Sequence, residues 1–227
     1  MPDHPPRRAL LFGAIGTLAE TSHLQREAFN LAFRQSGLDW NWDSDTYRDL
    51  LHTPGGANRI ATEARRRGET VDAAEIHSRK VANFRAAMLG DGPEPRPGVT
   101  DTIAAARTSG VLLGWVTTTG PDTVDLMLEG LKPAITPASF DLITSRLDVE
   151  RPKPAPDIYR HALERLDVLA ENAIAIEDTP ESADAALAAG IPTIGFPGWA
   201  ASDRAFPGGV TLVDRLSPEI LTQGQAA

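Results

Sequence analysis

A threonine stands where it could donate hydrogen bonds to a bound anion. Thr117 follows the apolar run 111–116 in the string VTTTG. A short apolar run is typical of a buried strand. A hydroxyl at the strand's end, beside exposed backbone N–H groups, can donate to an anion without adding charge. A threonine after a strand is also typical of a turn or a helix cap.

A lysine stands just before a predicted helix in the string RPKPAPDIY. Lys153 is followed by Pro154 and Pro156, which fix the entry into that helix. A positive charge at a helix N-terminus is unfavourable unless an anion lies between the charge and the helix dipole. Lys153 is therefore a candidate anion ligand, with a solvated surface lysine as the alternative.

Two acidic residues close another apolar run. Glu177 and Asp178 follow the run 173–176 in AIAIEDTPESADAALAAGI. Mg²⁺ binds hard oxygen ligands, normally one or two carboxylates with backbone, water or phosphate oxygens. This pair is therefore a candidate metal site. An acidic residue here would also cap the helix that starts near Pro180, with no metal needed.

Alternating strands and helices would position these residues. They follow the Gly- and Pro-rich string GDGPEPRPG at 90–98, which is predicted to be a linker. Strands are predicted at 111–116, 140–144, 173–176, 192–196 and 210–213, and helices at 99–109, 121–131, 154–166 and 182–189. The alternation predicts an α/β fold, a parallel sheet with helices on both faces. Such sheets place ligands at the carboxyl ends of the strands.

The first part of the chain contributes one strand and a helical block. A strand ends at Phe12, and helices are predicted from residue 21 and over 44–52, 57–67 and 72–89. The apolar face of the last helix is predicted to carry Ile76, Val81, Phe84 and Met88. No strand pattern interrupts the block, so it is predicted to be an insertion into the sheet domain. We expect one domain from 1–18 and 94–227, and an all-helical domain at 19–93.

Composition limits the classes of function. The 227 residues carry a net charge of −9, which opposes general binding to nucleic acid or to an anionic membrane. There is no cysteine, and hence no disulfide or thiol nucleophile. No apolar run approaches the roughly 20 residues of a membrane span. A cytoplasmic location is expected.

The string LLFGAIGTL at 10–18 resembles the first motif of the haloacid dehalogenase superfamily, hhhDxDGTL. The following AETSHLQREAFN resembles the sugar-phosphate phosphatase branch, which holds the beta-phosphoglucomutase and CbbY-like proteins. The resemblance covers residues 9–196. It implies a Rossmann-like core with an inserted helical cap.

The resemblance also implies roles for the candidate residues. Thr117, with Thr118 beside it, matches the second motif, which binds the substrate phosphate. Lys153 matches the lysine that holds the phosphate and the nucleophile together. Asp178 matches the Mg²⁺ ligand, with Glu177 next to it. A small phosphorylated metabolite is the implied ligand.

A loop of the cap resembles the substrate-specificity loop of the CbbY-like branch. In that branch a GGK-x-R pattern meets the distal phosphate of a sugar bisphosphate. In the string HTPGGANRI, Arg59 fits the arginine and Ala57 stands in place of the lysine. A glycine pair before a helix is also a plain helix start.

The first motif lacks both of its aspartates, because Gly13 and Ile15 stand in their places. In the family the first aspartate forms an aspartyl-phosphate and the second is the general acid and base. Glycine has no nucleophile, and isoleucine cannot transfer a proton. The loss at Gly13 also weakens the expected Mg²⁺ site. Glu20 is the nearest spare carboxylate in the sequence.

Three hypotheses follow. The leading one is a catalytically silent relative of sugar-phosphate phosphatases that binds a phosphorylated metabolite or a protein partner. The second is an active Mg²⁺-dependent hydrolase of small phosphate esters with a relocated nucleophile. The third is a structural or regulatory protein-binding module, which a cleft filled by Ile15 would favour.

Overall fold

The chain forms two compact units. The computed structural model describes residues 6–13, 15–51 and 55–222. One unit, the core, comprises Met1–Glu20 and Pro93–Ala227, and the other, the cap, comprises Thr21–Gly92. From the sequence, the boundaries between the two domains were expected after residues 18 and 93.

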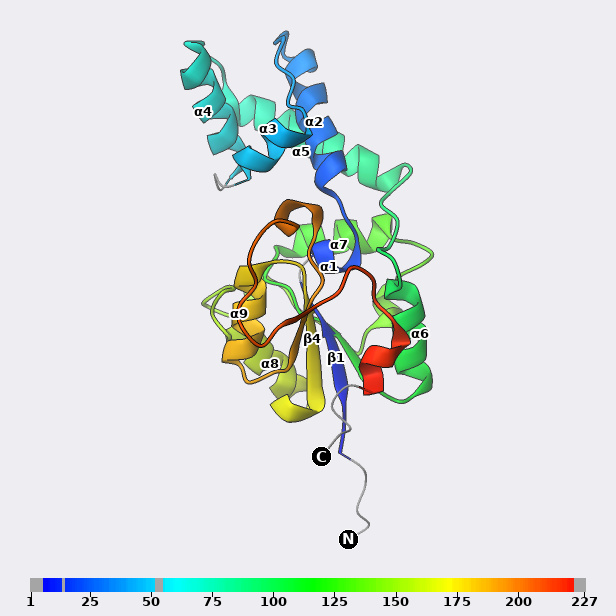
Figure 1. The fold of residues 1–227 in the computed structure, drawn as a ribbon. Coiled ribbons are helices and arrows are strands. Elements are labelled where there is room, and N and C mark those ends of the chain that lie inside the picture. The colour runs from blue at the N-terminus through cyan, green and yellow to red at the C-terminus, as the bar shows by residue number, and fades with distance from the viewer. Residues whose placement is uncertain (1–5, 14, 52–54, 223–227) are drawn as a thin grey trace. The chain divides into compact units, whose positions relative to one another are not determined.

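A six-stranded sheet organises the core, as Figure 1 shows. Its strands are β1 (Ala9–Phe12), β2 (Leu112–Trp115), β3 (Leu142–Ile143), β4 (Ala173–Glu177), β5 (Thr193–Gly195) and β6 (Thr211–Leu212). The order is β3-β2-β1-β4-β5-β6 and every pairing is parallel. β1 lies between β2 and β4, so the chain runs outward from it in both directions. The predicted parallel α/β fold is confirmed.

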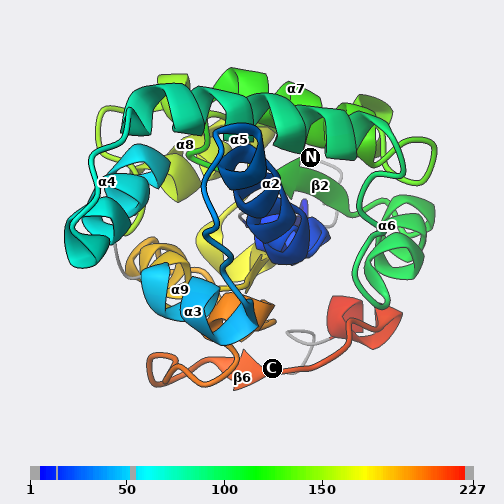
Figure 2. The same ribbon diagram turned by 90° about the horizontal axis from the view of Figure 1, so that it is seen from above.

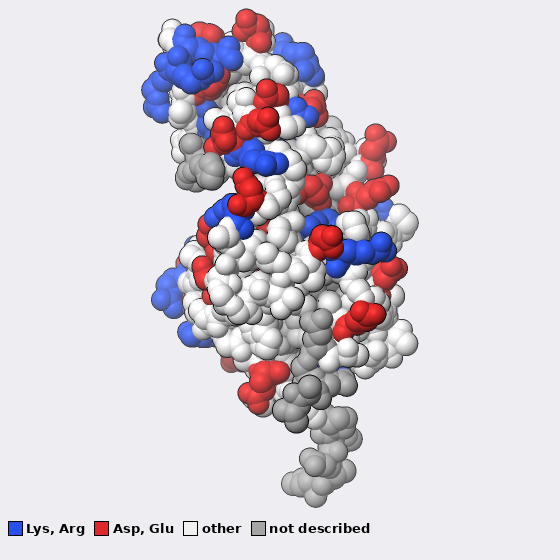
Figure 3. Space-filling model, in the orientation of Figure 1, with Lys and Arg blue, Asp and Glu red and all other residues white. Residues whose placement is uncertain are grey.

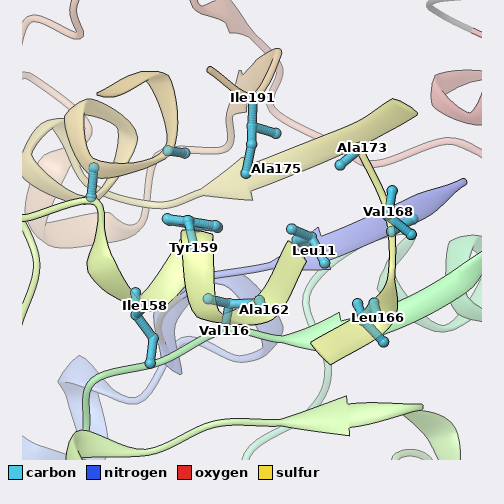
Figure 4. Packing of buried hydrophobic residues seen from close by; sticks show 13 residues of the cluster. Leu11, Val116, Ile158, Tyr159, Ala162, Leu166, Val168, Ala173, Ala175 and Ile191 are labelled. Carbon is cyan, nitrogen blue, oxygen red and sulfur yellow. The ribbon is translucent and has the colours of Figure 1, made fainter. Parts of the chain in front are cut away.

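Helices cover both faces of this sheet. They are α1 (Ile15–Leu18), α6 (Val99–Thr108), α7 (Pro121–Gly130), α8 (Asp157–Leu166) and α9 (Pro180–Ala188), with 3₁₀ turns η1 (Pro137–Ser139), η2 (Arg146–Asp148), η3 (Ala170–Asn172), η4 (Trp199–Ala201) and η5 (Pro218–Thr222). Both ribbon views place α8 and α9 on one side of the central strands and α6 on the other (Figures 1 and 2). Beneath α8, Tyr159 packs with Leu11 and Ala175 in one buried cluster (Figure 4).

Prolines move two helix starts away from the predicted positions. α8 begins at Asp157, three residues later than expected, because a residue before a proline avoids the helical region and Pro156 takes the cap position. α9 begins at Pro180, two residues before the predicted range 182–189 and at the start expected for the helix that the acidic pair would cap. Proline suits the first helical position, and the Thr179 side chain accepts a hydrogen bond from the N–H of Ser182.

The cap consists of helices around an aromatic cluster. Its helices are α2 (Ser22–Gln35), α3 (Ser44–Leu50), α4 (Gly56–Arg67) and α5 (Ala73–Leu89). Trp42 is fully buried, with its ring centroid 4.7 Å from that of Phe33 and 4.8 Å from that of Phe29. The Asn30 side chain fixes the backbone of Trp42 by donating to its carbonyl at 2.9 Å and accepting from its N–H at 2.8 Å.

The buried face of α5 differs from the prediction at one position. Val81 was expected on the apolar face, but it is 49% exposed. The buried residues are Ile76, Lys80, Phe84 and Met88, which recur every four residues. The helical period of 3.6 therefore places Lys80, a charged residue, in the row that sequence reasoning reserved for apolar side chains.

Basic residues gather on the surface at the end of α4, as Figure 3 shows. Arg66 and Arg67 both donate to the buried carboxylate of Glu63. These arginines thus form a structural ion pair at the helix C-terminus, where positive charge is favoured.

In the described part of the chain, no helix combines the length and the apolar character needed to cross a membrane.

Candidate functional site

The central strands end side by side and bring together the site residues that were predicted in the core unit. Phe12 at the end of β1 pairs with Trp115 in β2 and with Ile176 in β4. The N–H of Gly13 then donates to the carbonyl of Ile176 at 2.9 Å, which continues the ladder one residue beyond β1. Gly13 therefore lies beside Glu177 at the carboxyl edge of the sheet, where the sequence placed the site.

Strand alternation turns these two positions toward α8. Side chains along a strand point alternately to opposite faces. Leu11 and Ala175 lie in the buried cluster beneath α8 (Figure 4), so the positions two residues on, Gly13 and Glu177, face the same side. Tyr159 of α8 belongs to that cluster and is fully buried.

The carboxylate of Glu177 binds a lysine and a tyrosine. Its Oε1 accepts hydrogen bonds from Lys153 Nζ and from Tyr159 Oη. Lys153 Nζ also donates to the carbonyl of Val116 at 2.8 Å. The side chain of Glu177 is fully buried and that of Lys153 is 7% exposed, so solvent screens this ion pair little. Burial and the charge of Glu177 raise the pKa of Tyr159 well above its usual value, which keeps the phenol a neutral donor.

Gly13 provides the space that this carboxylate fills. A Cβ atom added at Gly13 would lie 2.5 Å from Glu177 Oε1 and closer still to Oε2 and Cδ. Any side chain at position 13 would therefore force Glu177 aside. Sequence reasoning missed this role of Glu177, which it read as a metal ligand. The available signal was a glycine directly after β1 opposite an acidic residue in β4, and it becomes visible only once the strand register is known.

The two threonines of the second motif lie in the loop after β2. Thr117 is buried. Its Oγ1 donates to Thr119 Oγ1 at 2.9 Å and accepts from the N–H of Thr119 at 3.1 Å. The N–H of Thr117 donates to Thr144 Oγ1 at 3.0 Å. Thr118 is half-buried. This loop is rigidly hydrogen-bonded, and phosphate binding by Thr117 and Thr118 stays a prediction.

The remaining first-motif positions lie nearby. Ile15 begins α1 and is half-buried. Glu20, the spare carboxylate of the sequence, accepts a hydrogen bond from the N–H of Trp199 at 2.7 Å. That contact ties Glu20 to the loop after β5.

Asp178 and Arg96 form the other charged part of the site. Burial and the neighbouring charge of Glu177 raise the pKa of Asp178 to about 7, although Lys153 and Arg96 act in the opposite direction. Arg96 donates to the carbonyls of Gly16 at 2.8 Å, Phe196 at 2.8 Å and Pro197 at 2.7 Å.

Arg96 thus clamps the first-motif loop to the loop after β5. Sequence reasoning placed it in a linker and missed it. An arginine between two prolines, in EPRPG, was the signal.

The carboxylates fit a Mg²⁺ site poorly in this arrangement. Mg²⁺ needs a nearly octahedral set of oxygen ligands. The Oε1 of Glu177 already accepts hydrogen bonds from Lys153 and Tyr159. The Oδ1 of Asp178 accepts a long hydrogen bond of 3.5 Å from Thr17 Oγ1. Within the described ranges, no three His, Asp or Glu side chains are grouped so that they could hold a metal ion. Metal binding by Asp178 and Glu177 stays a prediction.

The cap brings cationic groups together. Lys80 of α5 is 7% exposed, and its Nζ donates to Gln25 Oε1. Burial and the nearby charge of Arg59 lower the pKa of Lys80 to about 8. Burial, Lys80 and Arg59 also lower the pKa of His77. We call Arg59, His77 and Lys80 the cap cation group.

Arg59 was predicted from the sequence, whereas Lys80 and His77 were not. Arg59 lies in the first turn of α4, and its Nε donates to the carbonyl of Leu50 at 3.0 Å. Residues 52–54 of the predicted specificity loop lie outside the described residues. That Arg59 contacts a substrate stays a prediction.

Known proteins resemble this chain over most of its length. It is 40% identical over 209 residues to the protein CbbY of Cereibacter sphaeroides, covering 91% of each chain. It is 27% identical over 187 residues to a phosphorylated carbohydrates phosphatase of Thermotoga maritima, covering 82% of this chain and 83% of that one. A crystal structure of mutant CbbY from Rhodobacter sphaeroides with xylulose-(1,5)bisphosphate matches with a TM-score of 0.74 at 39% identity, covering 92% of this chain and 94% of that one.

A family model agrees with these similarities. The model of the haloacid dehalogenase-like hydrolases matches residues 11–196, which include the end of β1, the whole cap and the strands as far as β5. The parallel sheet and the inserted helices fit that match. The chain belongs to the haloacid dehalogenase-like hydrolase family.

Proposed function

We propose that this protein binds a phosphorylated sugar or a similar small metabolite without hydrolysing it. The observation that carries the proposal is the pairing of Gly13 with Glu177. The position of the family's nucleophile has no side chain, and its space is filled by a carboxylate that already binds Lys153 and Tyr159.

The loss of chemistry follows from these groups. A nucleophile must approach the phosphorus atom with a free lone pair. Glu177 is fully buried, and its Oε1 accepts hydrogen bonds from an ammonium and a phenol. Ile15 cannot protonate a leaving oxygen or activate water. Losing a nucleophile alone costs roughly a million-fold in a well-studied protease.

Anion binding is supported by the cap cation group. Burial, and after it the positive charge of Arg59, lower the pKa values of both Lys80 and His77. An anion beside them would relieve that repulsion. Since the relative CbbY binds a sugar bisphosphate, a phosphate group is the anion that we assign to this group.

Two measurements on the purified chain test the proposal. A panel of sugar mono- and bisphosphates, with Mg²⁺ present, is assayed for release of inorganic phosphate and for binding by calorimetry. We expect binding of at least one compound and no release above a heat-inactivated control.

Each departure from that result favours another function. If the natural chain releases inorganic phosphate and Lys153→Arg reduces that release, the protein is a hydrolase with a different nucleophile. Absence of binding across the panel would favour a protein-binding module.

A further inference from the structure

We propose that Glu177 has taken over one task of the missing first-motif carboxylate, that of counter-ion to Lys153. The anion position in front of Lys153 is then filled by the protein's own carboxylate. This inference deepens the proposed function and rests on it only in treating position 13 as a position without chemistry.

The first step is the space at Gly13. Gly13 lacks the positive φ that would make a glycine necessary for its backbone conformation. A Cβ there would overlap the carboxylate of Glu177, as described above. Glycine is therefore required at position 13 for room, and Glu177 uses that room. A side chain at position 13 and the present position of Glu177 exclude each other.

The second step is the charge of Lys153. A buried ammonium without a partner is strongly unfavourable, because water no longer solvates it. Lys153 Nζ has three oxygen partners, which are Glu177 Oε1, the carbonyl of Val116 and, at 3.4 Å, the uncharged Tyr159 Oη. The carbonyl and the phenol offer only partial charges, so Glu177 supplies the full negative charge that neutralises Lys153. With glycine at position 13, Lys153 depends on Glu177.

The third step is the competition that results. A phosphate approaching Lys153 meets a carboxylate already bound there, which repels it. Tyr159 donates a second hydrogen bond to Glu177, so displacing the carboxylate breaks both contacts. The core thus binds an external anion at Lys153 weakly while Glu177 is present.

A double-mutant cycle tests the coupling between positions 13 and 177. We expect Gly13→Asp to lower the Tm because it displaces Glu177, and Glu177→Ala to lower it because Lys153 loses its counter-ion, each by about 5 °C or more. The double variant Gly13→Asp/Glu177→Ala should melt higher than Glu177→Ala alone, since the introduced aspartate then has room and pairs with Lys153.

A matched control separates charge from space. Gly13→Ala/Glu177→Ala fills the same region without a carboxylate, so it should melt no higher than Glu177→Ala. The proposal is overturned if Gly13→Asp/Glu177→Ala melts no higher than Glu177→Ala, including the case in which it does not fold. Enzymatic turnover does not enter this comparison, so failure here is distinct from failure of the proposed function.

Binding of inorganic phosphate tests the competition directly. By calorimetry, Glu177→Ala should bind phosphate roughly tenfold more tightly than the natural chain, because it frees a buried cation. Adding Lys153→Met to Glu177→Ala should abolish the gain, whereas adding Lys80→Met in the cap should leave it. An unchanged affinity in Glu177→Ala, or a gain that survives Lys153→Met, would refute the self-filled anion position.

Discussion

The core and the cap each bury a lysine, but within the described residues only the core lysine pairs with a group of opposite charge, a carboxylate. In the core, Lys153 pairs with a buried carboxylate from the neighbouring strand. In the cap, Lys80 donates to an uncharged amide oxygen and lies 5.0 Å from the ring centroids of both Phe29 and Phe84. Burial and Arg59 lower its pKa to about 8.

The contrast separates a structural ion pair from a potential binding site. A neutralised pair is stable by itself and gains little from an external anion. A buried lysine that is repelled by a nearby arginine is less stable alone and gains from an anion. Substitutions at the two lysines and at their neighbours therefore differ in their effect on stability.

Removing the core lysine should be severely destabilising. Lys153→Met leaves Glu177 as a buried carboxylate without its cation, which costs about 3 to 5 kcal/mol of unfolding free energy. Chemical denaturation measures the loss. The exposed Lys132 pairs with exposed Glu129, so Lys132→Met is the control, with an expected change within about 0.5 kcal/mol. Equal effects of the two variants would contradict a special role of the core pair.

Removing the cap lysine should have the opposite sign. Lys80→Met places an apolar side chain of similar length between the two phenylalanine rings and removes an unfavourable charge. We expect the unfolding free energy at pH 7 to rise by about 1 to 2 kcal/mol. The same variant should bind sugar phosphates more weakly by calorimetry. A loss of stability like that of Lys153→Met would end the distinction between the two lysines.

The pH dependence of that gain identifies its cause. Below pH 8, Lys80 is protonated in both the folded and the unfolded state, and folding carries the full cost of burying the charge. Between pH 8 and the usual pKa of 10.5, the unfolded state binds a proton that the folded state has lost, so stability rises with pH.

The difference in unfolding free energy between the natural chain and Lys80→Met, here called the gap, should therefore narrow as the pH rises from 7 to 10. His77, whose pKa is lowered from 6.5, stays neutral over this range, and arginines such as Arg59 stay charged. Denaturation at several pH values measures the gap. A gap of constant size would mean that the charge of Lys80 is not what destabilises the cap.

The neighbouring position should be nearly silent. Val81 lies outside the buried row of α5 and is 49% exposed, so Val81→Ser should change stability by no more than about 0.5 kcal/mol. Phe84→Ala, in the buried row of Lys80, should cost about 3 kcal/mol or more. Chemical denaturation of both variants measures the difference. A large loss of stability in Val81→Ser would mean that Val81 lies on the buried face of α5, as the sequence predicted, and that Lys80 does not.

The fold was largely readable from the sequence because it rests on periodicity. The run ending at Phe12 and the run 173–176 read as buried strands, and they are β1 and most of β4. The errors arose where one residue changes a boundary locally. Pro156 delays α8, and the charge of Lys80 concealed its place in the apolar row of α5.

The site was readable in its parts but not in its pairing. The motif positions gave Lys153, Glu177 and the missing side chain at Gly13. That Glu177 occupies the space at Gly13 depends on the parallel register of β1 and β4, which brings together residues 164 positions apart in the chain. Arg96 was missed for the same reason, since its carbonyl partners are contributed by distant loops.

The position of a bound anion tests the central contrast most directly. Crystals of the natural chain soaked in tungstate, a phosphate analogue whose heavy atom is located by anomalous scattering, should show the anion at the cap cation group and none at Lys153. An anion on Lys153, with the carboxylate of Glu177 turned away from Gly13, would contradict the account.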